Sequence, residues 1–277
     1  MKVKTLLLIL LGIPIGCFAH EKKDQVKNKK GTFSFYWGYN RSFFSKTNIH
    51  FNGPNYDFTL YDVKGTDRPT PLSLTYINPT TISIPQYNYR LSYFINDRFA
   101  ISLGMDHMKY VMKQNQLARI SGIITPEASQ TFQGSYLNDE IKITPDLLQF
   151  EHTDGFNLVT VDGEYLLPLP VKMGKNFKSY FNMGIGGIWI VTKTNVKVMG
   201  EGLDNDFHVA GFSMAAKMGP RIEYKNKLFI LGEIKGGYAT LPSVLIKNEA
   251  PNIGDHNLSY LQYYFALGIN FSLKKKH

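Results

Sequence analysis

The sequence predicts an all-β protein, an antiparallel up-and-down β-barrel of about eight strands that spans an outer membrane. Three observations support this fold class. Apolar and polar residues alternate with a period of two over most of the chain, which is typical of strands whose two faces meet different surroundings. After the N-terminal segment, no apolar run is long enough to cross a bilayer as a helix. Aromatic residues make up 14% of the chain and gather near the expected strand ends, as in the interfacial girdles of membrane barrels.

Residues 1–19 are typical of a cleaved export signal. Two lysines precede an apolar run over 6–15, which is too short to span a bilayer, and small residues ending at Ala19 suit cleavage there. Cys17 permits a second interpretation, because a cysteine at this place can be lipidated and become the new terminus instead of being removed. It is the only cysteine, so the exported chain is expected to be stable without disulfides.

Basic residues are concentrated at the two ends of the expected mature chain. The formal net charge is +9, and the stretches 20–31 and 274–277 are rich in lysine and almost free of apolar residues. This composition predicts a flexible N-terminal segment and a solvated tail. A basic chain can bind nucleic acid, but an export signal directs this chain away from nucleic acid, so we predict no such partner. We expect no cofactor and no metal.

Eight segments carry the alternation. They cover residues 32–44, 86–95, 99–112, 157–167, 180–192, 211–224, 228–238 and 261–273. In the first four, the apolar face is formed by alternate residues from Phe33 to Tyr39, Tyr87 to Ile95, Phe99 to Met105 and Val159 to Leu167. In the last four, it runs from Phe181 to Trp189, Phe212 to Tyr224, Leu228 to Tyr238 and Leu261 to Leu273. Each segment is long enough for a tilted strand, which needs about 9–11 residues to cross a bilayer.

The connections between these segments differ in length in a regular way. Short turns are expected at 96–98, 168–176 and 225–227, whereas the connections at 45–80, 113–155, 199–207 and 239–257 are mostly long. Short periplasmic turns and long extracellular loops are typical of outer-membrane barrels, and an even strand count puts both termini on the periplasmic side. One barrel over 32–273 therefore accounts for the chain. The loops 45–80 and 113–155 alternate internally as well, which predicts hairpins that extend the barrel outward.

The face opposite the apolar one decides between a membrane barrel and a soluble barrel or sandwich. A soluble barrel turns its apolar face inward and exposes polar residues to water. Here the second face is rich in small residues, namely Ser92, Ser102, Gly104, Gly184, Gly186, Gly219, Ala266 and Gly268. Small residues fit the crowded interior of a narrow barrel, so we expect the large apolar residues to face lipid.

The last strand ends in a short motif, Gly268 to Leu273, with glycine first and apolar residues at its fourth and sixth positions. In this respect the chain resembles the small eight-stranded outer-membrane barrels of Gram-negative bacteria, such as the outer-membrane protein A transmembrane domain and outer-membrane protein X. The architectural resemblance covers about residues 32–273. It implies that the barrel-insertion machinery binds the last strand. The chain departs from the pattern by placing Leu273 where an aromatic residue is usual and by adding 274–277.

Charged residues on the inward face predict a network inside the lumen. They are Arg90, Asp106, Asp162, Glu164, Lys217, Arg221, Glu223, Glu233 and Lys235. The interior of an eight-stranded barrel is just wide enough to be filled by side chains, and buried charges must pair. We therefore expect a closed, salt-bridged lumen. Two alternatives are a narrow polar channel and an acid–base pair formed by Asp162 and Glu164, which share one face of a strand.

Histidines lie in or beside the expected long loops, at His50, His107, His152, His208 and His256. His107 and His152 belong to neighbouring strands, so they could meet at the outer rim with Glu151 and Asp154 and bind zinc or act in a hydrolase. Asp255, His256 and Ser259 could form a second set with a nucleophile. The alternative is that these histidines are exposed and inert.

The loops are the expected site of function, because ordered loops on a rigid scaffold usually carry it. The sequence favours a structural, adhesive or ligand-binding protein of the outer membrane, whose loops bind an unknown extracellular partner. Arg41, at the outer end of the first strand, could bind lipopolysaccharide phosphates or remain solvated. An enzyme that modifies outer-leaflet lipid, such as a lipid A acyl hydrolase or transferase, is the alternative, and a narrow pore is a second one.

Overall fold

The computed structural model describes residues 29–171, 173–204, 206–246 and 253–273. The predicted signal peptide, Cys17, most of the basic N-terminal segment and the tail at 274–277 lie outside these residues. Within the described part, the chain is mostly β-structure, and no helix there is long and apolar enough to cross a membrane. Its one assigned helical turn is η3, Leu74–Tyr76.

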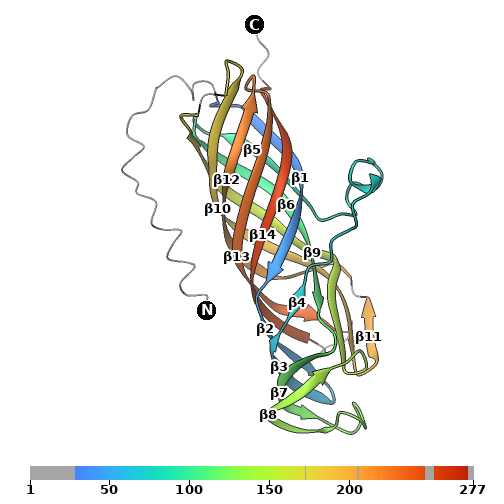
Figure 1. Ribbon diagram of the computed structural model, residues 1–277. Helices are drawn as coiled ribbons and strands as arrows, with labels where there is room; N and C mark the ends of the chain where they lie inside the picture. Colours follow the sequence, from blue (N-terminus) through green and yellow to red (C-terminus); the bar gives the residue numbers. More distant parts are fainter. Residues whose placement is uncertain (1–28, 172, 205, 247–252, 274–277) are drawn as a thin grey trace.

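Eight strands close into a barrel (Figure 1). They are β1 (Phe33–Phe44), β5 (Tyr87–Phe94), β6 (Phe99–Met112), β9 (Leu148–Pro168), β10 (Phe177–Val198), β12 (His208–Tyr224), β13 (Leu228–Leu245) and β14 (Ile253–Phe271). Each pairs antiparallel with the next in this order, and β14 returns to pair with β1 from Phe33↔Phe271 to Phe44↔Tyr260. The predicted all-β barrel of eight strands is confirmed.

The wall continues beyond one end of this ring. The strands β2 (Thr47–Gly53), β3 (Tyr56–Val63), β7 (Gln116–Ile124) and β8 (Gly134–Ile143) add to the side of β14 in that order. Two short strands, β4 (Gly65–Thr66) and β11 (Glu201–Asp204), pair with β6 and β10. We call these strands, together with the adjoining ends of β9, β10, β13 and β14, the extension. It lies at the lower end of Figure 1, opposite the short turns.

The strands that enter the extension are longer than the alternation predicts. The structure starts β9 at Leu148, where a loop to 155 is expected, and it continues β10 to Val198. Both predicted loops, 45–80 and 113–155, contain a hairpin, formed by β2 with β3 and by β7 with β8. The predicted loop at 199–207 is mostly the β10–β11 hairpin.

The polarity of the two strand faces inverts where the barrel meets the extension. On the outer face of β10, the exposed residues Ile185 and Trp189 are followed by Lys193 and Lys197. On its inner face, the small and polar positions near Asn182 give way to buried apolar residues such as Val198. Lipid favours an apolar outer face and water a polar one, so the inversion marks the membrane boundary.

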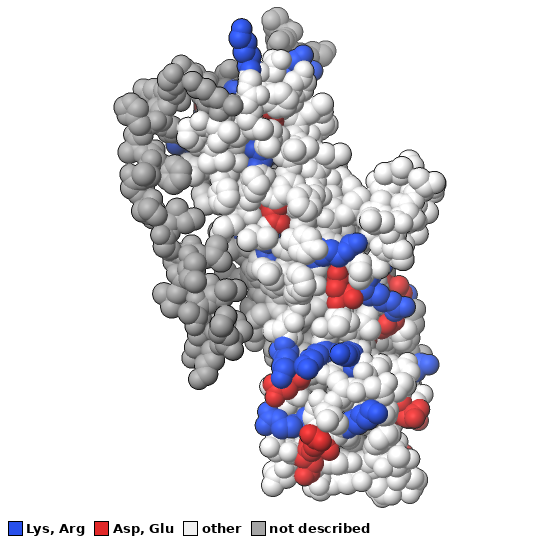
Figure 2. Space-filling model, in the orientation of Figure 1, with Lys and Arg blue, Asp and Glu red and all other residues white. Residues whose placement is uncertain are grey.

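The barrel part of the wall therefore carries an apolar outer belt. Its exposed residues include Leu91, Ile101, Leu103, Ile185, Trp189, Met214, Ile230, Phe265 and Leu267. Charged residues on the face shown in Figure 2 gather over the extension and leave most of the barrel surface white. The extension has an apolar core instead, in which Phe51, Phe58, Leu60, Phe150, Phe156 and Leu241 are almost fully buried.

We expect the extension to face outside the cell. A cysteine introduced at Leu137, which is exposed on β8, should react with a membrane-impermeant maleimide in intact cells. A cysteine at Asn226, in the turn between β12 and β13, should react only after lysis, because that turn lies at the opposite end of the barrel. Labelling of Asn226→Cys but not Leu137→Cys in intact cells would reverse the orientation.

Candidate functional site

The centre of the lumen is occupied by Arg90. Its guanidinium donates to both carboxylate oxygens of Asp106, at 2.7 and 2.9 Å, and its Nε donates to Asp162 Oδ2 at 3.0 Å. The side chains of Arg90 and Asp106 have no exposed surface. Such a two-point pairing fixes the planar guanidinium between strands β5, β6 and β9.

Two lysines extend this network across the lumen. Lys217 Nζ lies 3.2 Å from Asp162 Oδ2 and 2.6 Å from Glu164 Oε1, and Lys235 Nζ lies 2.7 Å from Asp106 Oδ2. Because Lys217 belongs to β12 and Lys235 to β13, the ion pairs join five strands around the ring. Asp162 and Glu164 share one cation and are almost fully buried, and their action as an acid–base pair stays a prediction.

A second group of paired charges lies in the lumen near the short turns. Arg221 Nη2 lies 2.7 Å from Glu223 Oε1 and donates to Asn270 Oδ1 at 2.7 Å. Glu223 also accepts from the Lys29 ammonium at 2.7 Å. Lys29 belongs to the basic segment that is expected to be flexible, but its side chain is buried in the mouth of the barrel. Lys29 thus supplies a fifth cation to the five carboxylates of the lumen.

Glu233 has neutral partners. It accepts from Asn182 Nδ2 at 2.6 Å and from the Tyr264 hydroxyl. Neutral side chains complete the network elsewhere as well, since Asn88 donates to Asp106 and Ser102 donates to Glu164, each at 2.7 Å. These neutral residues are not among the charged residues predicted for the network, although each occupies an inward position of the alternation that could have revealed it.

His152 and His256 lie inside the extension, not at an exposed rim. Both are fully buried in the apolar core, with ring centroids 6.0 Å apart and Tyr110 and Phe150 beside them. His152 Nδ1 is 2.9 Å from Thr194 Oγ1. Burial disfavours the charged imidazolium, so it lowers the pKa of His152 well below its usual value and that of His256 to about 3.

The predicted meeting of His107 with His152 is wrong. His107 occupies the outer face of β6, where it stacks on Tyr87 and its Nδ1 lies 2.8 Å from Asn157 Oδ1. His152 points to the opposite face of the wall, beside Tyr110. A strand places successive side chains on opposite faces, so adjacency of two strands does not bring such residues together.

The second predicted set does not converge either, for the same reason. His256 points into the core, whereas Asp255 and Ser259 occupy outward positions of β14. The remaining histidines are separate: His50 pairs with Asp57 at 2.7 Å on the surface, and His208 Nε2 lies 2.7 Å from the Ser243 carbonyl oxygen. Within the described ranges, no three His, Cys, Asp or Glu side chains form a group that could hold a metal ion.

Arg41 faces outward from β1 at the level of the segment that follows β4. Its Nη1 donates to the Asn40 carbonyl at 2.9 Å, and its Nη2 donates to the Tyr76 hydroxyl at 3.3 Å. Arg41 is therefore bonded to this segment in the structure, and contact with lipopolysaccharide phosphate stays a prediction.

Ion pairs at the surface of the extension connect residues that are distant in sequence. Arg119 on β7 pairs with Asp62 on β3 at 3.0 Å, and Arg68 pairs with Glu151 on β9 at 3.0 Å.

Among the described strands, β8 ends the added sheet and pairs only with β7. Its edge is interrupted, because Asn138 adopts a positive φ of 61° at a bulge and Asp139 accepts from the Leu137 backbone N–H. Such features prevent pairing with another strand.

Comparisons with known proteins show no family for this chain. No family model and no curated protein matches the chain. Among solved structures, it is similar to the outer membrane protein OprG of Pseudomonas aeruginosa, with 10% identity over 88% of this chain and 98% of that one and a TM-score of 0.35. For the outer membrane protein AlkL, the identity is 10%, the coverage 93% and 98%, and the TM-score 0.42. For Ail, the attachment invasion locus protein of Yersinia pestis, the identity is 12% over 87% of this chain and 99% of that one, and the TM-score is 0.30.

These likenesses are too distant to carry an argument, so the class of protein is defined by the structure itself. A closed ring of eight antiparallel strands, an apolar outer belt and a polar lumen together define a small outer-membrane β-barrel. The predicted architecture, similar to that of the outer-membrane protein A and X barrels, is confirmed at this level.

Proposed function

We propose that this protein is a closed outer-membrane barrel that acts at the cell surface by binding a partner through its extension. The observation that carries the proposal is the apolar core of the extension, which includes Phe51, Phe58 and Phe150. A chain that only needed to connect strands would not require such a core. A rigid scaffold that displays fixed side chains is the arrangement that binding proteins use.

The lumen supports the same proposal, because its contents are suited to closure and not to transport. Buried ion pairs lie inside the barrel part, and buried apolar side chains lie inside the extension. The interrupted edge of β8 disfavours recognition by strand addition. The faces of β3, β7 and β8, where positive and negative side chains are interspersed, are the surface that we assign to the partner.

We expect the purified protein to give no large, steady conductance in planar lipid bilayers. An eight-stranded barrel leaves room for side chains only, and the ion pairs around Arg90 join five of the eight strands across the lumen. A porin of known conductance, inserted in the same bilayers, shows that channels are detectable. Steady openings that persist in independent preparations would favour the pore alternative.

The binding role is tested by removing the β7–β8 hairpin. Residues 115–143 are replaced by a short Gly-Ser turn, and the barrel is checked by its altered gel migration without boiling. Attachment of the expressing cells to protein-coated and polysaccharide-coated surfaces should fall to the level of cells without the protein. Unchanged attachment would contradict the assignment, and a lipid A mass that changes with expression of the protein would favour the lipid-modifying enzyme.

A further inference from the structure

The segment between β4 and β5 folds back over the outer wall of the barrel instead of extending away from the membrane. It is the teal lobe beside the barrel in Figure 1. From Pro69 to Gln86 it contains no charged residue, and Leu72, Leu74, Ile77 and Ile84 are exposed. In Figure 2 the lobe is white and lies beside the mostly white part of the barrel. Exposed apolar side chains at this level are stable in lipid and unfavourable in water.

Polar contacts hold this segment to the wall. The Tyr39 hydroxyl on β1 donates to the Tyr76 carbonyl at 2.5 Å, and the two rings lie 4.8 Å apart. Arg41 donates to the Tyr76 hydroxyl, and Lys109 Nζ on β6 donates to the Ile84 carbonyl at 3.0 Å. The segment is thus attached to the wall at two places, on β1 and on β6, and these contacts fix its position.

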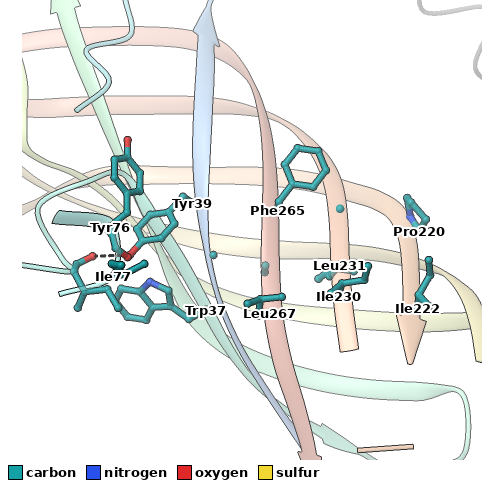
Figure 3. A pocket seen from close by; sticks show the side chains of 14 residues that line it. Trp37, Tyr39, Tyr76, Ile77, Pro220, Ile222, Ile230, Leu231, Phe265 and Leu267 are labelled. Carbon is teal, nitrogen blue, oxygen red and sulfur yellow. Dashed lines mark hydrogen bonds between the residues drawn. The ribbon is translucent and has the colours of Figure 1, made fainter. Parts of the chain in front are cut away.

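Between the segment and the wall lies an apolar groove with a volume of about 740 Å³ (Figure 3). Tyr76, Ile77 and Ile82 line one side. The other side is lined by residues of four neighbouring barrel strands, including the outward side chains of Trp37, Phe265 and Ile230. No lining residue is charged. Gly232 widens the groove, since it leaves an outward position of β13 without a side chain.

We propose that this groove binds one acyl chain of a lipid of the surrounding membrane. Its position decides the occupant: the lining residues belong to the belt that faces hydrocarbon, so acyl chains surround the groove, whereas a soluble ligand would have to cross the lipid to reach it. Its volume is in the range of small-molecule sites, which is about 300–1,000 Å³. This site is separate from the extension and does not depend on the function proposed above.

Photo-crosslinking in vesicles tests the site. The protein is reconstituted in phosphatidylcholine that contains a fraction of phosphatidylcholine with a diazirine on one acyl chain, and adducts are mapped by mass spectrometry after illumination. We expect labelling of Trp37, Ile77 and Phe265 to exceed severalfold that of Leu103 and Ile185, which face lipid elsewhere on the belt. Even labelling of the whole belt would overturn the proposal.

A matched pair of variants tests whether the groove itself causes the excess labelling. Gly232→Phe places a ring in the groove, where the exposed and flexible Phe265 side chain is its nearest neighbour, 3.2 Å from the added Cβ. Gly187→Phe adds the same ring to an outward position of β10 with open space around it. The excess labelling should disappear in Gly232→Phe and persist in Gly187→Phe. An excess that survives in Gly232→Phe, or a groove left unlabelled because a peptide or a collapsed segment fills it, contradicts binding of an acyl chain there.

Discussion

Replacing Arg90 by alanine is expected to destabilise the barrel by about 3–5 kcal/mol, the cost of leaving buried charges without their partner. Arg90 contacts both Asp106 and Asp162, and all three side chains are almost fully buried. Lys235 and Lys217 would remain beside these carboxylates, so the loss should fall within this range and not exceed it. The free energy of unfolding is measured by urea titration in lipid vesicles.

The matched control is Arg68→Ala. Arg68 forms an ion pair of similar length with Glu151, at 3.0 Å, but its side chain is 62% exposed. Exposed pairs contribute about 0–1 kcal/mol because water and salt screen them. Equal losses in the two variants would show that the lumen network contributes no more than a surface pair, and the interpretation of the lumen as a charge-paired plug would be abandoned.

Acidification is expected to destabilise the extension more than the barrel. Burial lowers the pKa of His256 to about 3 and that of His152 well below its usual value. A histidine in the unfolded chain has a pKa of about 6.5. Below about pH 6.5 the unfolded chain binds protons that the folded chain excludes, so stability falls as the pH falls. For His256 this decrease continues to about pH 3, and between pH 6.5 and 5 it amounts to about 2 kcal/mol.

Hydrogen exchange of the strands β2, β3 and β7 at pH 7 and pH 5 provides the measurement. The neighbours of the two rings are apolar or neutral, with Tyr110, Phe150 and Thr194 in contact, so no carboxylate compensates a proton there. His256→Phe should reduce the pH dependence, because it removes one titrating group from the core. His50→Phe is the control, since His50 lies on the surface. A pH dependence that His256→Phe leaves unchanged would mean that other groups cause it.

These two results would separate the protein into two parts with different stabilising interactions. The barrel would depend on ion pairs inside the lumen, and the extension on an apolar core that tolerates no charge. The difference follows from the surroundings, since the barrel has lipid outside and must place its polar residues inside, whereas the extension has water outside and reverses the arrangement.

The amino-acid sequence alone determined the strands that span the membrane and the direction of their side chains. A period of two is a local property, so residues such as Arg90, Lys217 and Glu233 could be assigned to one face without knowledge of their partners. That face is the lumen in the structure. The same reasoning identified hairpins in the two longest loops.

Only the tertiary structure decided what each face meets outside the membrane-spanning strands. Phe150 and His152 lie where a loop is expected, but they belong to β9 and are buried because strands distant in sequence, such as β2 and β14, contact them. Lys29 belongs to a basic stretch, but Glu223, far along the chain, holds it inside the barrel. The segment around Tyr76 has no period that reveals its return to the wall, which depends on Tyr39 and Arg41. Burial and pairing depend on such distant neighbours, and local alternation carries no information about them.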